Sequence, residues 1–203
     1  MSTTATPSRK VLLFVLLVPF LILISWIAYH EMRTPQNQEE VLTRMIELER
    51  EGRYDRAVKV VEFWLKDSRR DISRDGLLYD QMAMVYIAKA YKRPSSHEES
   101  IHQAELNLEQ SLSLSDQQNQ NDLRVDLFEI GSKYELLGDI SSRDKCRLYE
   151  KAQGLLLRQL PLIRGDSYTA YGKTLRLEPF RAEVRKHLNA VIEKSSKAGC
   201  QVH

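Results

Sequence analysis

Two histidines, His97 and His102, have the spacing in this sequence that comes closest to a chemical motif. They bound the segment HEESIH, which is one residue longer than the zinc motif H-E-x-x-H, where two histidines four residues apart share a helix face and the glutamate acts as a base. At a separation of five, the two rings point about 140° apart on a helix, so one metal ion cannot bind both. We therefore expect no metal site and interpret the segment as the first turn of a helix, capped by Ser95 or Ser96.

A second short match is Arg164-Gly165-Asp166, an adhesion tripeptide. Matches of three residues arise often by chance, and we interpret this one as a glycine-containing turn between helices. The sequence has no glycine-rich phosphate loop, no G-x-S-x-G elbow and no Cys/His/Asp grouping with nucleophile spacing. Its carboxylates are scattered. We therefore predict no catalytic, cofactor-binding or metal-binding residues, and a protein that is not an enzyme.

Residues 11–29, VLLFVLLVPFLILISWIAY, contain no Asp, Glu, Lys or Arg. A helix of this length spans roughly 28 Å, close to the thickness of the bilayer hydrocarbon core. A cleaved signal peptide is an alternative, but cleavage after Ala28 would put bulky Trp26 where a small residue is preferred. A buried core helix, the other alternative, would show a polar edge. We predict a single transmembrane helix in contact with membrane lipid.

The basic residues around this span indicate its direction. Arg9 and Lys10 directly precede it, and Arg33 and Arg44 follow it. The two sides are nearly equal in Lys and Arg, and the closeness of Arg9 and Lys10 favours an N terminus inside. The domain after the span is then expected to be periplasmic or otherwise extracytoplasmic, with residues 1–10 as the inner tail.

The part after the span is electrically neutral, because it holds all 28 acidic residues and all but two of the 30 basic ones. A neutral domain has no bulk attraction to nucleic acid, so we predict no nucleic-acid partner. Acids exceed bases in residues 95–150, and bases exceed acids in 164–203. Ordinary solvated helix faces explain this division, and a docking surface with two poles is the alternative.

Two cysteines are too few for a disulfide framework. Cys146 lies in a helical stretch and is expected to be a small buried residue, and Cys200 lies in a tail that is expected to fray. A bridge between the two stays open, since an oxidising compartment permits a disulfide without requiring one.

From residue 39 onward, apolar residues recur at steps of three and four, and alternating β-branched runs are absent. This pattern predicts an all-α fold of six or seven helices after a linker at residues 30–38. Breaks between helices are predicted at Gly52, 71–76, 94–96, 115–121, Gly138 and 161–172.

Small and large residues recur in a fixed order within these helices. One kind of helix has two large residues three positions apart, then a small residue, then an aromatic three positions on. All share one face, and the small residue lets a neighbouring helix approach closely. A second kind has a small residue followed four positions later by a large one. The first kind comprises Leu127, Ile130, Gly131, Tyr134 and also Tyr79, Met82, Ala83, Tyr86; the second comprises Ala57, Val61 and also Ala104, Leu108.

This order resembles the tetratricopeptide repeat, a helix–turn–helix unit of about 34 residues. Three units are recognisable, roughly at 39–70, 76–116 and 122–154, within a repeat domain of residues 39–160. Three departures stand out. The first unit has Met45 where the family has a small residue, the second has about nine extra residues between its helices, and the third has Lys145 at the small position of its second helix. A non-repeat bundle whose core mimics the pattern is the alternative.

Residues 161–203 are expected to form a loop, a capping helix and a tail. Glu178-Pro179 is typical of a helix start. The helix that follows is expected to bury one side, as the last helix of a repeat stack must, and a basic amphipathic helix on anionic lipid is the alternative. The apolar side comprises Phe180, Val184, Leu188, Val191 and Ile192.

The resemblance implies a stack whose first helices line a groove for a peptide or a partner helix. Met45, Tyr79, Met84 and Tyr86 are candidates for that groove or for the core. None of the expected groove positions supplies a cation, which argues against capture of a peptide's terminal carboxylate, as some members of the family do. These positions are Leu42, Ile46, Asp80, Gln81, Met84, Val125 and Glu129.

Similar single-span bacterial members of the family assist envelope assembly or membrane translocation. The resemblance therefore implies a membrane-anchored scaffold that binds unidentified protein partners without a cofactor. Two alternatives stay open. One is a self-assembling structural protein that forms homo-oligomers, and the other is an enzyme whose site is built from dispersed acids and histidines.

Overall fold

The computed structural model describes residues 35, 37–66, 75–117, 120–163, 165, 167–170 and 173–200. They belong almost entirely to one compact unit, Asn37–His203. The predicted transmembrane helix, residues 11–29, lies outside the described residues. Within the described part, no helix combines the length and the apolar character needed to cross a membrane.

Seven α-helices and one β-hairpin make up the described part, so the predicted helical fold is confirmed apart from the hairpin. The hairpin occupies a stretch that the sequence predicts to be a loop. Two 3-10 turns, Pro94–Ser96 and Leu160–Leu162, precede α5 and follow α7. The elements are α2 (Gln38–Arg50), α3 (Tyr54–Leu65), α4 (Asp75–Lys92), α5 (His97–Gln117), α6 (Gln120–Ile140), α7 (Lys145–Gln159), β1 (Ser167–Ala170), β2 (Lys173–Arg176) and α8 (Leu177–Lys197).

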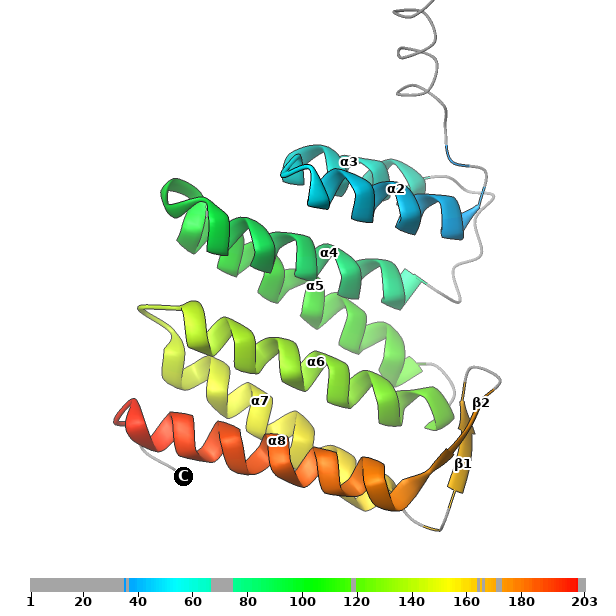
Figure 1. The fold of residues 1–203 in the computed structure, drawn as a ribbon, viewed down its shortest axis with the longest axis vertical. Coiled ribbons are helices and arrows are strands. Elements are labelled where there is room, and N and C mark those ends of the chain that lie inside the picture. The colour runs from blue at the N-terminus through cyan, green and yellow to red at the C-terminus, as the bar shows by residue number, and fades with distance from the viewer. Residues whose placement is uncertain are drawn as a thin grey trace, which may run out of the picture. The chain divides into compact units, whose positions relative to one another are not determined.

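The helices pack as successive pairs in two layers. α2 packs on α3, α4 on α5 and α6 on α7, and α8 then packs on α7. Figure 1 shows α2, α4, α6 and α8 in the near layer, with α3, α5 and α7 behind them. We call these the first-helix layer and the second-helix layer. Repeated helix–helix packing is thus a property of the fold.

Local signals set the ends of the first pair. The Asn37 side chain accepts a hydrogen bond from the Glu40 N–H at 2.9 Å and so caps α2. Gly52 has φ of 71°, a left-handed conformation that glycine adopts without strain. The Arg53 N–H reaches back to the Leu48 carbonyl at 2.8 Å across this turn. The predicted break at Gly52 is confirmed.

α4 contributes to two hydrophobic clusters. Leu78, Met82 and Val85 pack with α2 and α3, whereas Ala83 and Ile87 pack with α5 to α8. The helix is therefore buried on more than one side, and it joins the first pair of helices to the rest of the unit.

The buried small residues of the second helix pair recur in the third pair with a step of 48 residues. Ala83 and Gly131 are the small residues of their first helices, and Ala104 and Ala152 those of their second helices; all four are buried. The two small residues of a pair are 21 positions apart in both cases. The expectation that Lys145 occupies the small position of α7 is wrong, because Ala152 does. In both pairs, the two small residues are further apart in the sequence than in the tetratricopeptide pattern.

Gly131 has the predicted role. A Cβ at this position would stand 3.3 Å from Leu156 Cγ on α7, so the missing side chain allows close approach of the two helices. The predicted helix stop at Gly138 is wrong, because α6 continues to Ile140. There the glycine makes room for the ring of Tyr149, another close contact between α6 and α7.

β1 and β2 pair antiparallel, with Ser167 opposite Arg176, and β2 leads directly into α8. α8 begins at Leu177, two residues before the predicted start at Pro179. Leu177, Val184 and Val191 are fully buried, which confirms that this helix buries one side. Ile192 departs from the prediction, because it is exposed.

Candidate binding face

A buried ion pair joins α4 to α6 in the first-helix layer. Lys133 Nζ lies 2.7 Å from Asp80 Oδ2, and the two side chains are only 10% and 6% exposed. Gln81 Nε2 donates to the same oxygen at 3.4 Å. The other oxygen, Asp80 Oδ1, is buried and has no hydrogen-bond partner among the described residues. The carboxylate therefore keeps acceptor capacity that the described fold does not use.

Acidic groups surround this pair. Glu129 Oε2 lies 3.8 Å from Lys133 Nζ, too far for a hydrogen bond. Burial raises the pKa of Glu129, and the charges of Asp80 and Asp126 reinforce this shift against the opposing charge of Lys133. The Lys133 ammonium thus lies between two carboxylates, those of Asp80 and Glu129. Sequence reasoning missed Lys133 as a groove cation, although it follows Glu129 by four residues and so shares its helix face.

The four predicted groove-or-core residues divide between the two roles. Met45 is 1% exposed and lies in the cluster of α2 and α3. Tyr79, Met84 and Tyr86 on α4 are half-buried. Tyr79 packs against the α2–α3 cluster, Met84 against the larger cluster and Tyr86 against both. These three α4 side chains therefore combine core contacts with some exposure.

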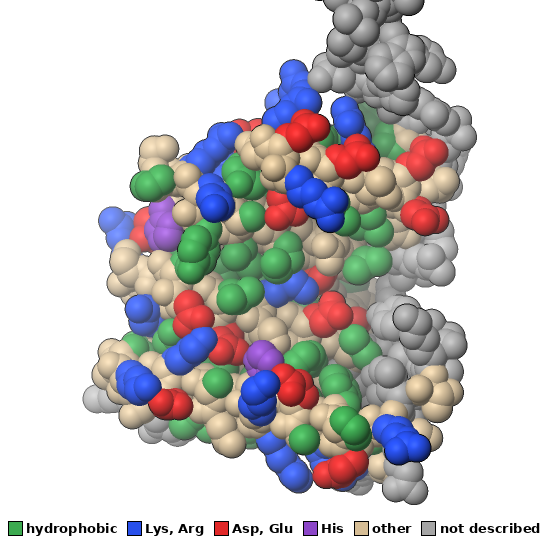
Figure 2. Space-filling view, viewed as in Figure 1, with side chains coloured by type: hydrophobic (Ala, Val, Ile, Leu, Met, Phe, Trp, Pro, Cys, Tyr) green, Lys and Arg blue, Asp and Glu red, His purple; other side chains and the backbone are tan. Residues whose placement is uncertain are grey.

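Figure 2 shows hydrophobic side chains over α4 and between α4 and α6, with charged side chains of both signs among them. Gln81 and Met84 are half-buried in this region of the chain, as are Leu42 and Ile46 on α2. We call the surface formed by Gln81, Met84 and Glu129 around the Asp80–Lys133 pair the candidate binding face.

At the α8 end of the first-helix layer, side chains of α6 and α8 contact each other. Glu135 on α6 accepts from Lys194 Nζ at 2.7 Å and lies 3.1 Å from His187 Nδ1. Phe128 meets the rings of Phe180 and His187 edge-on, at centroid distances of 5.6 and 5.0 Å. His187 is thus engaged on both sides, and we assign this cluster to the docking of α8.

The second-helix layer carries a row of ion pairs between α5 and α7. Buried Glu105 accepts from Arg147 Nη2 at 2.8 Å and from Lys151 Nζ at 2.6 Å. Further along, Asp116 Oδ1 accepts from Arg158 at 2.5 Å. Although burial opposes it, hydrogen bonding from Arg147 and Lys151 lowers the pKa of Glu105 to about 2. This row joins the second pair of helices to the third.

The two histidines of the HEESIH segment have different surroundings. His97 is half-buried and bonded to two backbone carbonyls, whereas His102 is exposed. Ser96 Oγ donates to the Arg93 carbonyl at 3.4 Å instead of capping α5. Among the described residues, no three His, Cys, Asp or Glu side chains are grouped to hold a metal ion. Arg164 and Asp166 of the tripeptide lie outside the described residues, and Gly165 between them has φ of 94°.

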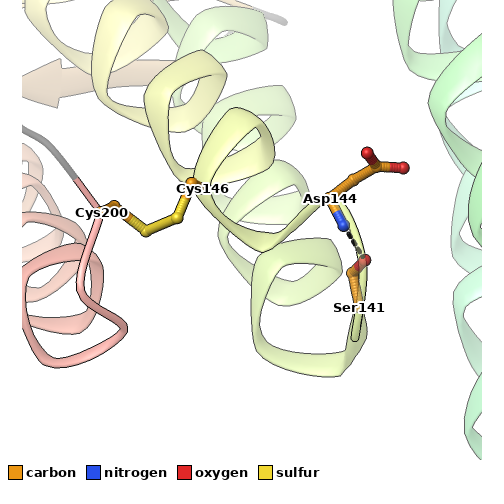
Figure 3. The surroundings of a disulfide bond; sticks show 4 residues. All are labelled: Ser141, Asp144, Cys146 and Cys200. Atoms are coloured by element: carbon orange, nitrogen blue, oxygen red, sulfur yellow. Dashed lines mark hydrogen bonds between the residues drawn. A yellow bond between two sulfur atoms is a disulfide. The ribbon is translucent and has the colours of Figure 1, made fainter.

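A disulfide links Cys146, near the start of α7, to Cys200, just after α8 (Figure 3). The expectations that Cys146 is buried and that Cys200 lies in a frayed tail are therefore wrong. Cys146 is exposed at the protein surface, and the bond holds Cys200 in place. Beside it, Ser141 Oγ accepts from the Asp144 N–H at 3.0 Å and shapes the turn into α7 (Figure 3).

In comparisons with known proteins, no family model matches the chain, and neither a curated protein nor a solved structure matches it significantly.

Proposed function

We propose that this protein is a non-catalytic, tetratricopeptide-like binding protein that holds a segment of a partner protein against the candidate binding face. The Asp80–Lys133 pair carries the proposal, because it leaves one oxygen of a buried carboxylate unbonded on the helix that also carries half-buried Met84. The 48-residue step between the buried small residues of the second and third pairs supports a repeat architecture, which presents such faces to extended partners.

Charge indicates the chemistry of the partner. Asp80 and Glu129 both lie within ion-pair distance of Lys133, so two carboxylates share one ammonium. The carboxylate of Glu129 is disfavoured by its surroundings, as its raised pKa indicates. A Lys or Arg side chain of the partner would stabilise the ionised carboxylate of Glu129. Apolar residues beside it in the partner would cover Met84. We infer a partner segment that combines apolar and basic residues.

We further propose that residues 11–29 anchor the protein in a membrane with this domain on the outer side. The disulfide between Cys146 and Cys200 supports that side, because disulfides persist in oxidising compartments and are rare in the cytosol. Blocking free thiols in intact cells tests the location. Labelling of both cysteines only after reduction is expected, and labelling without reduction contradicts the outer location.

Site-specific photo-crosslinking of the full chain in its own membranes tests the binding function. A photoreactive residue at Met84 is expected to form an adduct with a partner protein. The same residue at Leu106 or Leu157, which are exposed on α5 and α7, is expected to form none. The adduct from position 84 should contain Lys or Arg beside apolar residues at the crosslinked segment of the partner.

Charge reversal supplies the matched control. Glu129→Lys is expected to abolish the adduct from position 84, whereas Glu150→Lys, an exposed change on α7, is expected to leave it. Equal adducts from both layers, or none from position 84, would overturn the proposal. An adduct to a second copy of this chain would replace it with the self-assembling alternative.

A further inference from the structure

Two backbone carbonyls at helix ends lack the N–H that would normally bond them. Four residues after Ala90, near the end of α4, the chain has Pro94, which carries no N–H. Four residues after Ile140, the last residue of α6, the Asp144 N–H donates instead to Ser141 Oγ at 3.0 Å. Both carbonyls therefore need a donor from elsewhere.

The ring of His97 meets both. Its Nδ1 lies 3.0 Å from the Ala90 carbonyl oxygen, and its Nε2 lies 2.9 Å from the Ile140 carbonyl oxygen. A carbonyl oxygen only accepts, so each ring nitrogen must carry a hydrogen to bond it. A neutral imidazole has one N–H, and only the imidazolium ion has two. The observed contacts are those of a protonated ring.

We propose that His97 is a pH-sensitive clamp that holds the ends of α4 and α6 together when its ring is protonated and loosens when the ring loses a proton. In the neutral ring, the unprotonated nitrogen would face a carbonyl oxygen, and their lone pairs repel. One of the two bonds is then lost. The helices α4 and α6 would stay joined through Asp80 and Lys133, about three turns away along α4 and about two along α6.

The surroundings of the ring determine the direction of the effect. The C-terminal ends of α4 and α6 favour a cation, whereas the N-terminal end of α5, where His97 lies, disfavours one. The hydrogen bond to Ala90 raises the pKa of His97, burial opposes the shift, and the bond to Ile140 and the charge of Glu98 add to it.

The other charged groups at this junction are mostly engaged elsewhere. Glu98 accepts from Ser142 Oγ at 2.8 Å. Lys89 and Arg93 on α4 pair with Asp55, and Asp144 pairs with Arg147. Asp139, which precedes Ile140 on α6, pairs with Lys194. Other charged residues near this junction are Glu99 on α5, Lys92 on α4, Arg143 before α7 and Lys145 on α7.

The sign of the linkage follows from the raised pKa. Below about 6.5, the ordinary value for histidine, His97 is protonated in folded and unfolded chains alike, and the clamp contributes its full stability. That stability is lost as the pH rises through the folded-state pKa. Because the clamp sets the spacing of α4 and α6, it would also tune the candidate binding face; this consequence alone depends on the proposed function.

Two measurements on the full chain in detergent test the clamp. The first is an NMR titration of ¹⁵N-labelled histidine in the unaltered protein. His97 is expected to hold protons on both ring nitrogens above pH 6.5, the ordinary pKa of histidine. A His97 pKa at or below 6.5 would overturn the proposal, and this result needs no variant to fold.

The second measurement compares His97→Gln with the matched control His102→Gln. Glutamine can donate to only one of the two carbonyls, because its other terminal atom is an acceptor. The unfolding constant of His97→Gln relative to the original chain is expected to fall as the pH rises from 5 to 9, by tenfold for each unit by which the folded pKa is raised. His102→Gln should show no such trend. A pH-independent ratio for His97→Gln would contradict the clamp, whatever the crosslinking at position 84 shows.

Discussion

Tyr149 on α7 lies so close to Gly138 on α6 that a Cβ at the glycine would stand 2.5 Å from the tyrosine ring. The tyrosine is buried, and its hydroxyl donates to Asp139 at 2.8 Å, which fixes the ring in place. In the preceding helix pair, 48 residues earlier, Ala90 and Ile101 occupy the two positions. Alanine thus faces isoleucine in the second pair, whereas glycine faces the larger tyrosine ring in the third. The glycine is therefore matched to the size of the ring.

Gly138→Ala is therefore expected to destabilise the fold. Overpacking of this contact should cost about 1–3 kcal/mol, which exceeds the gain of up to about 1 kcal/mol from removing a glycine inside a helix. Chemical unfolding of the full chain in detergent, followed by circular dichroism, measures the difference.

Gly154→Ala is the matched control. Gly154 also lies inside a helix, but no atom comes within 4 Å of the position that its Cβ would take. This change should stabilise the protein by about 0.5–1 kcal/mol through helix propensity alone. If the two alanine variants were equally stable, the close contact between Gly138 and Tyr149 would not contribute to the unfolding free energy.

Lys133→Met is expected to be among the most damaging single changes in the described fold. It leaves the buried carboxylate of Asp80 without its cation, and breaking a buried pair in this way costs about 3–5 kcal/mol. Replacing both partners, as in Asp80→Leu with Lys133→Met, should recover most of that loss, because no buried charge remains. The unfolding free energies of the original chain, the two single variants and the double variant form a double-mutant cycle.

Lys186→Met provides the comparison, since this lysine is 74% exposed and pairs only with a neighbour on its own helix. Its loss should change stability by less than about 0.5 kcal/mol. Costs that simply add in the double variant would show that Asp80 and Lys133 act independently, contrary to the contact between them.

Glu105 should make the unfolding free energy fall at low pH. Its pKa is lowered to about 2, so its ion pairs contribute fully above the unfolded value of 4.5 and are lost as the pH falls through about 2. Glu105→Gln is expected to cost about 1–3 kcal/mol at pH 7, toward the lower end because Arg147 is half-exposed. The difference in unfolding free energy should shrink as the pH falls from 5 to 2.

Glu150→Gln, at an exposed position on α7, serves as the reference for this titration and should show no such convergence. A cost for Glu105→Gln that stays constant from pH 7 to pH 2 would mean that folding does not lower the pKa of Glu105.

The repeated spacing of apolar residues predicts the helical fold, because it records which face of each helix is buried. It also predicts close helix approach at Ala83, Gly131 and Ala104; this is confirmed at Gly131, and the two alanines are buried. The assignment of the small position of α7 to Lys145 is wrong because it uses the shorter turn of the tetratricopeptide repeat. The step of 48 residues places that position at Ala152. A comparison of the second and third units with each other could have found it.

The candidate site was less predictable, because its contacts join distant residues. Asp80 and Lys133 are 53 residues apart, and periodicity says which face each occupies but not that the two faces meet. The role of His97 depends on two carbonyls, one 43 residues away. Gly138 is ambiguous for a related reason, since a glycine near a helix end fits both a stop and a close contact.

The link between Cys146 and Cys200 could not be deduced from two cysteines either, and its removal gives a further prediction. The bond closes a loop of 54 residues that contains the hairpin and α8. In the chain-entropy account, cross-linking a loop of this length stabilises the fold by up to about 4 kcal/mol, because the unfolded chain loses freedom.

Replacing both cysteines with serine should therefore lower the unfolding free energy by about 2–4 kcal/mol. A reducing agent should lower that of the original chain by a similar amount and leave the double serine variant unchanged. Cys146 is exposed, so reduction should not require prior unfolding. Because α8 packs on α7 through Val184, Leu188 and Val191 as well, the reduced protein is expected to remain helical at 25 °C. Loss of helical signal on reduction alone would mean that the apolar contacts of α8 cannot hold it without the covalent bond.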